Sequence, residues 1–564
     1  MTQMERKRMN EYALYHRGES EYAYAHSKSE VTLRLRVDRN DSIDAVRVVY
    51  GGKYDFYGTQ FRKEMMLRYV DRLFAYYEVT LRLKDVRLTY VFEIVEDGKV
   101  WFFSEDGLTE TYDFALNFYN CFQFPYINDS SVIETVPYLQ KTVFYEIFID
   151  RFARGDKKKD DSYITMKWNE KPTPKSFAGG DLEGIIKKIP YLKMLGVNGI
   201  YLTPIFTSVS NHKYDISDYY EIDPHFGTKE TLRTLVKKAH EAGMKILLDA
   251  VFNHVSENHP FFQDVKKNGE RSPYCRYFKR KNGKFECFSS CQYMPKWDTD
   301  NPEVQDYLIG IGKHYIEEYD IDGWRLDVSD EVSHPFWKRF RKETKAVKKE
   351  VALIGENWHD AHPFLEGDEF DSIMNYAFTK AMLDFLAFDA LDERGTSDRL
   401  NSLLVRNADP VNSMMLNLLD SHDTNRFFTE VGKNLDRYLI GLAILFFFEG
   451  VPCLYYGDEA LMEGGYDPDS RRGFRPNTNN EAYRLIRFLS RMRKRSDFAF
   501  SRLRVSFANG LLLLERFGKD SDYVLAVKKG EGEVAYSASE VLWSNHYESG
   551  TLKPCGFVVE RRKK

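Results

Sequence analysis

Four acidic side chains follow short apolar runs that have the length and composition of buried β-strands. They are Asp249 in LLDAVFNH, Asp327 in DGWRLDV, Glu356 in VALIGEN and Asp423 in LLDSHDTNR. Buried carboxylates are costly unless they are paired or hydrogen-bonded, so four of them at strand ends indicate convergence on one site. Carboxylate pairs are the groups with which proteins cleave glycosidic bonds. The sequence therefore predicts a carboxylate site that acts on sugars.

The part of the chain from about residue 140 alternates short apolar strands with amphipathic helices. The expected strands are VFYEIFID, GIYLTPI, KILLDAV, GWRLDV, ALIGEN, SIMNY, MMLNLLD and CLYYGD. Between the second and third, TLRTLVKKAHEAG places Leu232, Leu235, Val236 and Ala239 on one helical face, and Gly243 is a natural C-terminal stop. Eight strand–helix units predict a (β/α)8 barrel of the TIM type, whose chemistry lies at the carboxyl ends of the strands.

The 564 residues exceed what one hydrophobic core accommodates, so further domains are expected. Short alternating strands between residues 20 and about 100 are typical of an antiparallel β-sandwich, and strands return after the last barrel helix in LLLLERF, YVLAVKK and GFVVERR. We expect a multidomain chain with an N-terminal β-sandwich (1–130), a catalytic barrel (131–498) and a C-terminal β-sandwich domain (499–564). A subdomain is expected after the third barrel strand, at about 255–302.

Composition excludes several classes of function. The net charge of −5 argues against a nucleic-acid-binding protein. The first 18 residues have no apolar core typical of a secretory leader, and no apolar run reaches the roughly 18 residues of a membrane helix. A cytoplasmic location is therefore expected. Cys275, Cys287 and Cys291 crowd one segment without a common zinc spacing, so free thiols, a disulfide and a metal site all stay open.

These motifs, in this order, resemble the α-amylase family of retaining glycoside hydrolases. Within it, the chain is similar to the cyclomaltodextrinase, maltogenic amylase and neopullulanase group, and the opening ALYHRGESEYAYAHSKSEVTLRLRV resembles that group's starch-binding-type module. The resemblance implies cleavage of α-1,4 links in cyclodextrins, maltooligosaccharides and pullulan, with α-1,6 cleavage and glycosyl transfer as further activities. It also implies a homodimer in which the N-terminal module joins the partner's active site.

The resemblance assigns the chemistry to three carboxylates. Asp327 stands at the nucleophile position, Glu356 at the acid/base position and Asp423 at the position of the third carboxylate, which grips sugar hydroxyls. Arg325 lies two residues before Asp327 on the same strand face, and its guanidinium should keep Asp327 ionised. Retention requires the two reacting carboxyl groups to lie about 5–5.5 Å apart.

The resemblance also implies a set of substrate-binding side chains. Tyr214 and His254 are expected against the sugar at the cleavage point, Trp358 on the acceptor side, and Asp467 with Arg471 on the other side of the cut. The full set is Tyr214, Asp249, His254, Arg325, Glu331, Trp358, His422, Asp467 and Arg471. Glu331 in VSDE and the segment MPKWD are near matches to the group's VANE and MPKLN. Trp297 in MPKWD either forms a sugar platform or packs the loop.

One departure from the group concerns calcium. The group's first long loop reads roughly DRFANGDxxND…GGD, whereas this chain reads DRFARGDKKKDD…AGGD. Asp156, Asp160 and Asp181 remain, but Arg154 and Lys159 replace two asparagine ligands. Fixed cations disfavour a divalent cation, so we expect calcium binding to be weak or absent and no other cofactor. Lys159, with Arg154, is expected to supply the positive charge instead.

Two other classes of function share parts of this pattern. Transferases or isomerases on the same scaffold carry the same carboxylates, so the products must distinguish them from a hydrolase. Non-catalytic glucan-binding proteins with an amylase-like barrel usually lack one of the three carboxylates, and this chain has all three.

Overall fold

The computed structural model describes residues 9–564, which form two compact units. The first comprises the N-terminal residues through Thr135 together with Leu391–Asn412 and Leu503–Glu515, and the second comprises Val136–Ala390, Ser413–Arg502 and Arg516–Lys564. Residues 1–8, where the expected N-terminal domain begins and where no leader is expected, lie outside the described residues. Within the described range no helix is long and apolar enough to cross a bilayer.

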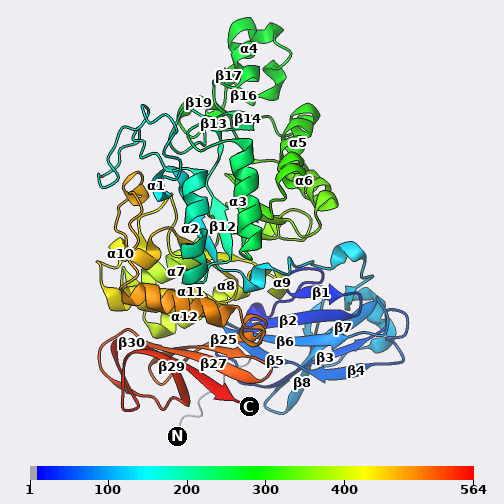
Figure 1. Cartoon of the computed structure of the whole chain (residues 1–564). Coiled ribbons are helices and arrows are strands. Elements are labelled where there is room, and N and C mark those ends of the chain that lie inside the picture. The colour runs from blue at the N-terminus through cyan, green and yellow to red at the C-terminus, as the bar shows by residue number, and fades with distance from the viewer. Residues whose placement is uncertain (1–8) are drawn as a thin grey trace. The chain divides into compact units, whose positions relative to one another are not determined.

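The N-terminal part of the first unit is a sandwich of two antiparallel sheets (Figure 1). One sheet has the order β1 (Ala23–Ser27), β2 (Glu30–Asp38), β6 (Phe74–Arg82) and β5 (Met66–Val70). The other has the order β4 (Phe61–Glu64), β3 (Ile43–Gly51), β7 (Leu88–Glu96), β8 (Lys99–Ser104) and β9 (Gly107–Thr109), with β10 (Phe122–Phe124) paired to β7. This unit also contains α8 (Glu393–Leu404) and α9 (Asp409–Asn412).

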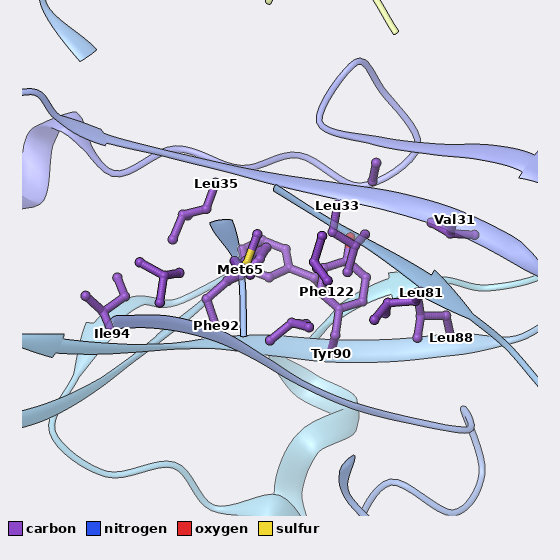
Figure 2. Packing of buried hydrophobic residues seen from close by; sticks show 14 of the residues in the cluster. Val31, Leu33, Leu35, Met65, Leu81, Leu88, Tyr90, Phe92, Ile94 and Phe122 are labelled. Atoms are coloured by element: carbon purple, nitrogen blue, oxygen red, sulfur yellow. The ribbon is translucent and has the colours of Figure 1, made fainter. Parts of the chain in front are cut away.

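Strand alternation builds the core between these two sheets. Successive side chains of a strand point to opposite faces, so Val31, Leu33 and Leu35 of β2 share one buried face. Figure 2 shows this face opposite Tyr90 and Phe92 of β7. The expected N-terminal β-sandwich is confirmed.

The second unit contains the barrel, an eight-stranded parallel sheet with the order β22–β21–β20–β15–β12–β11–β24–β23. An isolated parallel bridge between Met374 and Leu416 links the two ends of this order, so the barrel is nearly closed. All eight expected strands form, as β11 (Phe144–Ile147), β12 (Gly199–Leu202), β15 (Lys245–Ala250), β20 (Gly323–Leu326), β21 (Ala352–Gly355), β22 (Ser372–Ile373), β23 (Leu416–Leu418) and β24 (Val451–Tyr455).

Helices surround the barrel strands, and Figure 1 shows α2 beside α3. Outside the insertion after the third barrel strand, the α-helices of this unit are α1 (Ile149–Phe152), α2 (Leu182–Leu195), α3 (Lys229–Glu241), α5 (Pro302–Tyr319), α6 (His334–Val347), α7 (Tyr376–Leu386), α10 (Phe427–Glu430), α11 (Leu435–Phe447), α12 (Glu481–Arg493) and α13 (Ser496–Ala499). Helix α3 buries the predicted apolar face. The Thr228 hydroxyl caps its first turn, and Gly243 follows its end with a φ of +78°.

The expected insertion after the third barrel strand is present. It contains α4 (Pro260–Asn268), β16 (Arg280–Lys281), β17 (Lys284–Phe285), β18 (Cys287–Phe288) and β19 (Cys291–Pro295), and a hairpin of β13 (Phe206–Ser208) and β14 (Ile216–Ile222) precedes it in the chain. Trp297 is fully buried and stacks on Phe278, with ring centroids 4.8 Å apart. Trp297 therefore packs the loop, and its alternative role as a sugar platform is wrong. All six cysteines are free.

The C-terminal segment of the chain forms an antiparallel sheet domain. Its long strand β30 (Thr551–Lys563) pairs with β27 (Ser521–Lys528), β28 (Val534–Ala535) and β29 (Glu540–Glu548). The preceding strands are β25 (Arg502–Ala508) and β26 (Leu511–Phe517). The barrel and its flanking β domains are thus those that the strand patterns predicted.

Candidate active site

Three of the four predicted acids meet around the guanidinium of Arg325, a fully buried residue of β20. Its Nη1 atom lies 2.6 Å from Oδ1 of Asp327 and 3.0 Å from Oδ1 of Asp249. Its Nη2 atom lies 2.9 Å from Oε1 of Glu356, although the angles there do not meet hydrogen-bond geometry. Neighbouring strands β15, β20 and β21 place these side chains together because parallel strands end at one edge of the barrel.

The shared guanidinium governs how these acids titrate. Burial raises the pKa of Asp327 well above its usual range; Arg325 opposes this shift, and Glu356 and Asp249 add to it. Burial also raises the pKa of Glu356, again against Arg325. Three buried carboxylates with one cation hold a proton at a pH where isolated carboxyl groups have lost it. The sequence predicted that Arg325 keeps Asp327 ionised. Because Arg325 also contacts Asp249 and Glu356, it favours the ionised form of Asp327 less than that prediction assumed.

A strained backbone residue helps to position Glu356. Val328, which follows Asp327 by one residue, has a φ of +45°, which is rare for a β-branched residue. This conformation directs its N–H to Oε2 of Glu356 at 2.9 Å. The indole N–H of Trp358 donates to Oε1 of the same carboxylate at 3.2 Å. Strain of this kind persists where surrounding structure enforces it, often at functional sites.

Asp423 is held by a second set of charges in the loop after β23. Its Oδ2 atom lies 3.1 Å from Nε2 of His422, and its Oδ1 atom lies 3.1 Å from Nη2 of Arg471. Arg471 also pairs with Asp467 at 2.8 Å. Burial raises the pKa of Asp423, but His422 and Arg471 outweigh it and hold the pKa below the ordinary value. Asp423 is therefore an ionised acceptor beside the other two acids.

These groups border a pocket of about 930 Å³, a size typical of small-molecule sites. The predicted residues that line it are Asp327, Glu356, Asp423, Tyr214, His254, Glu331, Trp358, Asp467 and Arg471. The other three, Asp249, Arg325 and His422, are fully buried behind the lining. They support the residues at the surface of the pocket. Glu331 pairs with Lys296 at 2.7 Å and so joins the VSDE and MPKWD motifs.

The sequence analysis missed five aromatic rings that line this pocket, and two of them stack on predicted residues; the five are Phe288, Tyr293, Tyr376, Phe388 and Tyr466. Tyr376 of α7 stacks face to face with Trp358, with centroids 3.7 Å apart and planes 4° apart. Phe288 of β18 stacks on His254, with centroids 4.7 Å apart. The only signal for them was the 15% aromatic content, which does not say which rings reach the site.

In the loop that resembles a calcium site, the ammonium group of Lys159 lies against Asp181. Nζ of Lys159 lies 2.8 Å from Oδ2 of Asp181 and donates to the carbonyl oxygens of Gly179 at 2.8 Å and His225 at 3.0 Å. The other two acids bond within the loop: Asp156 accepts from the N–H of Lys158, and Asp160 accepts from Ser162. Arg154 lies 3.6 Å from Asp161. These residues do not fit a divalent cation, because Asp156 and Asp160 do not join Asp181 and the oxygens near Asp181 already accept hydrogen bonds from the Lys159 ammonium.

A (β/α)8 barrel with carboxylates gathered at its strand ends is the architecture of many glycoside hydrolases. The alpha amylase catalytic domain matches residues 146–290 and 284–497, and the alpha amylase N-terminal ig-like domain matches residues 9–128. The chain therefore belongs to the α-amylase family, and it is a glycoside hydrolase of the cyclomaltodextrinase and maltogenic amylase type.

Individual relatives agree with this assignment. A cyclomaltodextrinase of Thermoanaerobacter pseudethanolicus is 43% identical over 82% of this chain and 81% of its own. A maltogenic alpha-amylase of Bacillus acidopullulyticus is 37% identical over 93% of each chain. A solved cyclomaltodextrinase structure matches with a TM-score of 0.88 at 32% identity, covering 98% of each chain. The predicted family resemblance is confirmed.

Proposed function

We propose that this chain is a retaining α-glucan hydrolase that cleaves α-1,4 bonds in cyclodextrins, maltooligosaccharides and pullulan. The observation that carries the proposal is the pairing of Asp327 and Glu356 with one guanidinium beside the pocket. Oδ1 of Asp327 is bound by Arg325, whereas its buried Oδ2 has no hydrogen-bond partner among the described residues. Oδ2 is thus the oxygen whose lone pairs are not engaged by another described group.

The reaction follows from these positions. With the shared proton on Glu356 and Asp327 ionised against Arg325, Oδ2 of Asp327 forms a bond to the anomeric carbon while the glycosidic C–O bond breaks, and the proton of Glu356 passes to the leaving oxygen. Glu356, now ionised, takes a proton from a water that attacks the same carbon, so the ester bond to Asp327 breaks and the starting state returns. Ionised Asp423 accepts hydrogen bonds from sugar hydroxyls.

The anomeric configuration of the first product tests the mechanism. Proton NMR during hydrolysis of maltotriose should show the α-anomer before mutarotation, and Asp327→Asn should abolish turnover because the nucleophile is lost. Asp330→Asn is the matched control, because Asp330 lines the same pocket but faces His359, at 3.9 Å, instead of Arg325. Release of the β-anomer, or an Asp327→Asn variant that keeps more than a few per cent of the wild-type rate, would refute the proposal.

Initial rates and products on β-cyclodextrin, pullulan, starch and maltotriose separate the hydrolase from a transferase or isomerase. A hydrolase generates one new reducing end per bond cleaved, whereas an isomerase generates none. We also propose that the protein is a cytoplasmic homodimer that binds through its N-terminal domain, with α-1,6 cleavage and glycosyl transfer as minor activities. Family membership and the similarity to the group's N-terminal module support the proposed location, dimer and minor activities.

A further inference from the structure

Glu146 is a fully buried carboxylate on β11 that lies behind the lining of the pocket. Its Oε1 atom lies 2.5 Å from Nδ1 of His422 and accepts the backbone N–H of the same residue at 3.1 Å. Its Oε2 atom has no hydrogen-bond partner among the described residues. A buried carboxylate in this state is costly unless a cation lies against it. The imidazole of His422 is the titratable group in contact with it.

The opposite nitrogen of this imidazole also faces acceptors. Nε2 of His422 lies 3.1 Å from Oδ2 of Asp423 and 2.6 Å from Oη of Tyr214. The Tyr214 hydroxyl directs its own proton to Oδ2 of Asp249 at 2.9 Å, so its oxygen accepts from His422. Both ring nitrogens therefore face oxygens that accept hydrogen bonds. This environment requires a proton on each nitrogen, which is the imidazolium form.

We infer that Glu146 is a positioning residue for the proposed hydrolysis: its charge keeps His422 as an imidazolium, which in turn keeps Asp423 ionised and oriented toward the pocket. The inference rests on the proposed function only for the role of Asp423. Glu146 does not line the pocket, so it acts through His422 and not on substrate.

The charges around His422 explain why Glu146 decides its state. Two carboxylates, Glu146 and Asp423, contact the ring from β11 and from its own loop, and Arg471 donates to the carbonyl oxygen of His422 at 2.8 Å. Burial lowers the pKa of His422, but Asp423 and Glu146 outweigh both burial and Arg471, so the pKa rises above its ordinary value. Without Glu146, one carboxylate and one guanidinium oppose each other and burial favours the neutral ring.

The test compares Glu146→Gln with the wild-type enzyme across pH. Glutamine keeps the volume and can accept the Nδ1 proton, but it carries no charge. The ratio of kcat/KM on maltotriose, variant over wild type, should fall about tenfold as pH rises through the His422 pKa of the variant, which burial places below the ordinary value of about 6.5. A merely structural role would lower the ratio equally at every pH. Glu146→Asp, which keeps the charge, should restore most of the wild-type profile.

Glu459→Gln is the matched control. Glu459 is also fully buried, and one of its oxygens accepts from Tyr145 and Tyr191 while the other has no partner among the described residues. The partners of Glu459 are neutral phenols, so removing its charge should leave the pH dependence of kcat/KM unchanged.

Nitrogen-15 NMR of histidine in the wild-type enzyme provides a measurement that needs no variant to fold. One imidazole should stay doubly protonated at pH values above the ordinary pKa of about 6.5, where an unperturbed histidine has lost a proton. The absence of such a ring, or a Glu146→Gln profile that superimposes on the wild type, would overturn the inference. Failure of the wild-type enzyme to cleave any α-glucan would refute the proposed function instead and leave the NMR result interpretable.

Discussion

Replacement of Lys159 tests whether an ammonium has taken the place of calcium in the first barrel loop. Its side chain is 10% exposed and that of Asp181 is 2% exposed, so the ion pair is largely removed from water. Lys159→Met keeps most of the apolar stem and removes the charge together with the hydrogen bonds to Gly179 and His225. We propose that this loss destabilises the barrel and that added calcium does not restore it.

The expected size follows from what remains around Asp181. Removing one partner of a buried ion pair costs about 3–5 kcal/mol. Asp181 still accepts the N–H groups of Gly155 at 2.8 Å, Asp156 at 3.2 Å and Gly184 at 2.7 Å, and it caps the N-terminus of α2. Because these donors still satisfy the Asp181 carboxylate, we expect Lys159→Met to lower the free energy of unfolding by about 2–3 kcal/mol. In a unit of several hundred residues this lowers Tm by roughly 2–5 °C.

The assay is differential scanning calorimetry with a chelator and with added calcium. Wild-type Tm should not respond to either, and Lys159→Met should melt lower under both conditions. Lys158→Met is the control, because Lys158 is the exposed neighbour. Restoring both neutral donors in the double variant Arg154→Asn, Lys159→Asn should make Tm rise with calcium. A large fall in wild-type Tm with chelator, reversed by calcium, would refute the reasoning, as would an unchanged Tm for Lys159→Met.

Other expectations concern the site and the assembly. Glu356→Gln should lose maltotriose hydrolysis but keep much of the first step on glucosyl fluoride, whose leaving group needs little protonation; equal losses on both substrates would argue against Glu356 as the acid. Trp358→Phe should keep the stack on Tyr376 but lose the donor to Glu356, so its kcat should fall several-fold and its pH profile should shift, whereas Trp358→Ala should also raise KM. Identical kinetics for both tryptophan variants and the wild type would contradict this. The intact chain should sediment as a dimer at micromolar concentration and turn over β-cyclodextrin faster than starch per mole; a monomer would contradict the shared-site arrangement.

Much of the fold and the central acids could be predicted from sequence, because both depend on local pattern. Alternation with a period of two residues identified the strands of the N-terminal sandwich, and the apolar face of α3 appeared where the helical period placed it. Asp327 and Glu356 directly follow β20 and β21, so the strand prediction also located these acids. Parallel strands in a barrel end at one rim, and a site at that rim was therefore a consequence of the strand order.

Tertiary structure alone decided which groups meet at that rim and in the loops. Arg325 lies two residues from Asp327, yet its guanidinium also reaches Asp249 and Glu356 on neighbouring strands. The sequence showed that Lys159 replaces a calcium ligand, but the carbonyl groups that it binds belong to segments 20 and 66 residues away. Glu146 and His422, 276 residues apart, meet only because β11 and the loop after β23 share the interior of the barrel. Proton positions in this enzyme depend on such long-range contacts, since low dielectric and shared charge act through space and not along the chain.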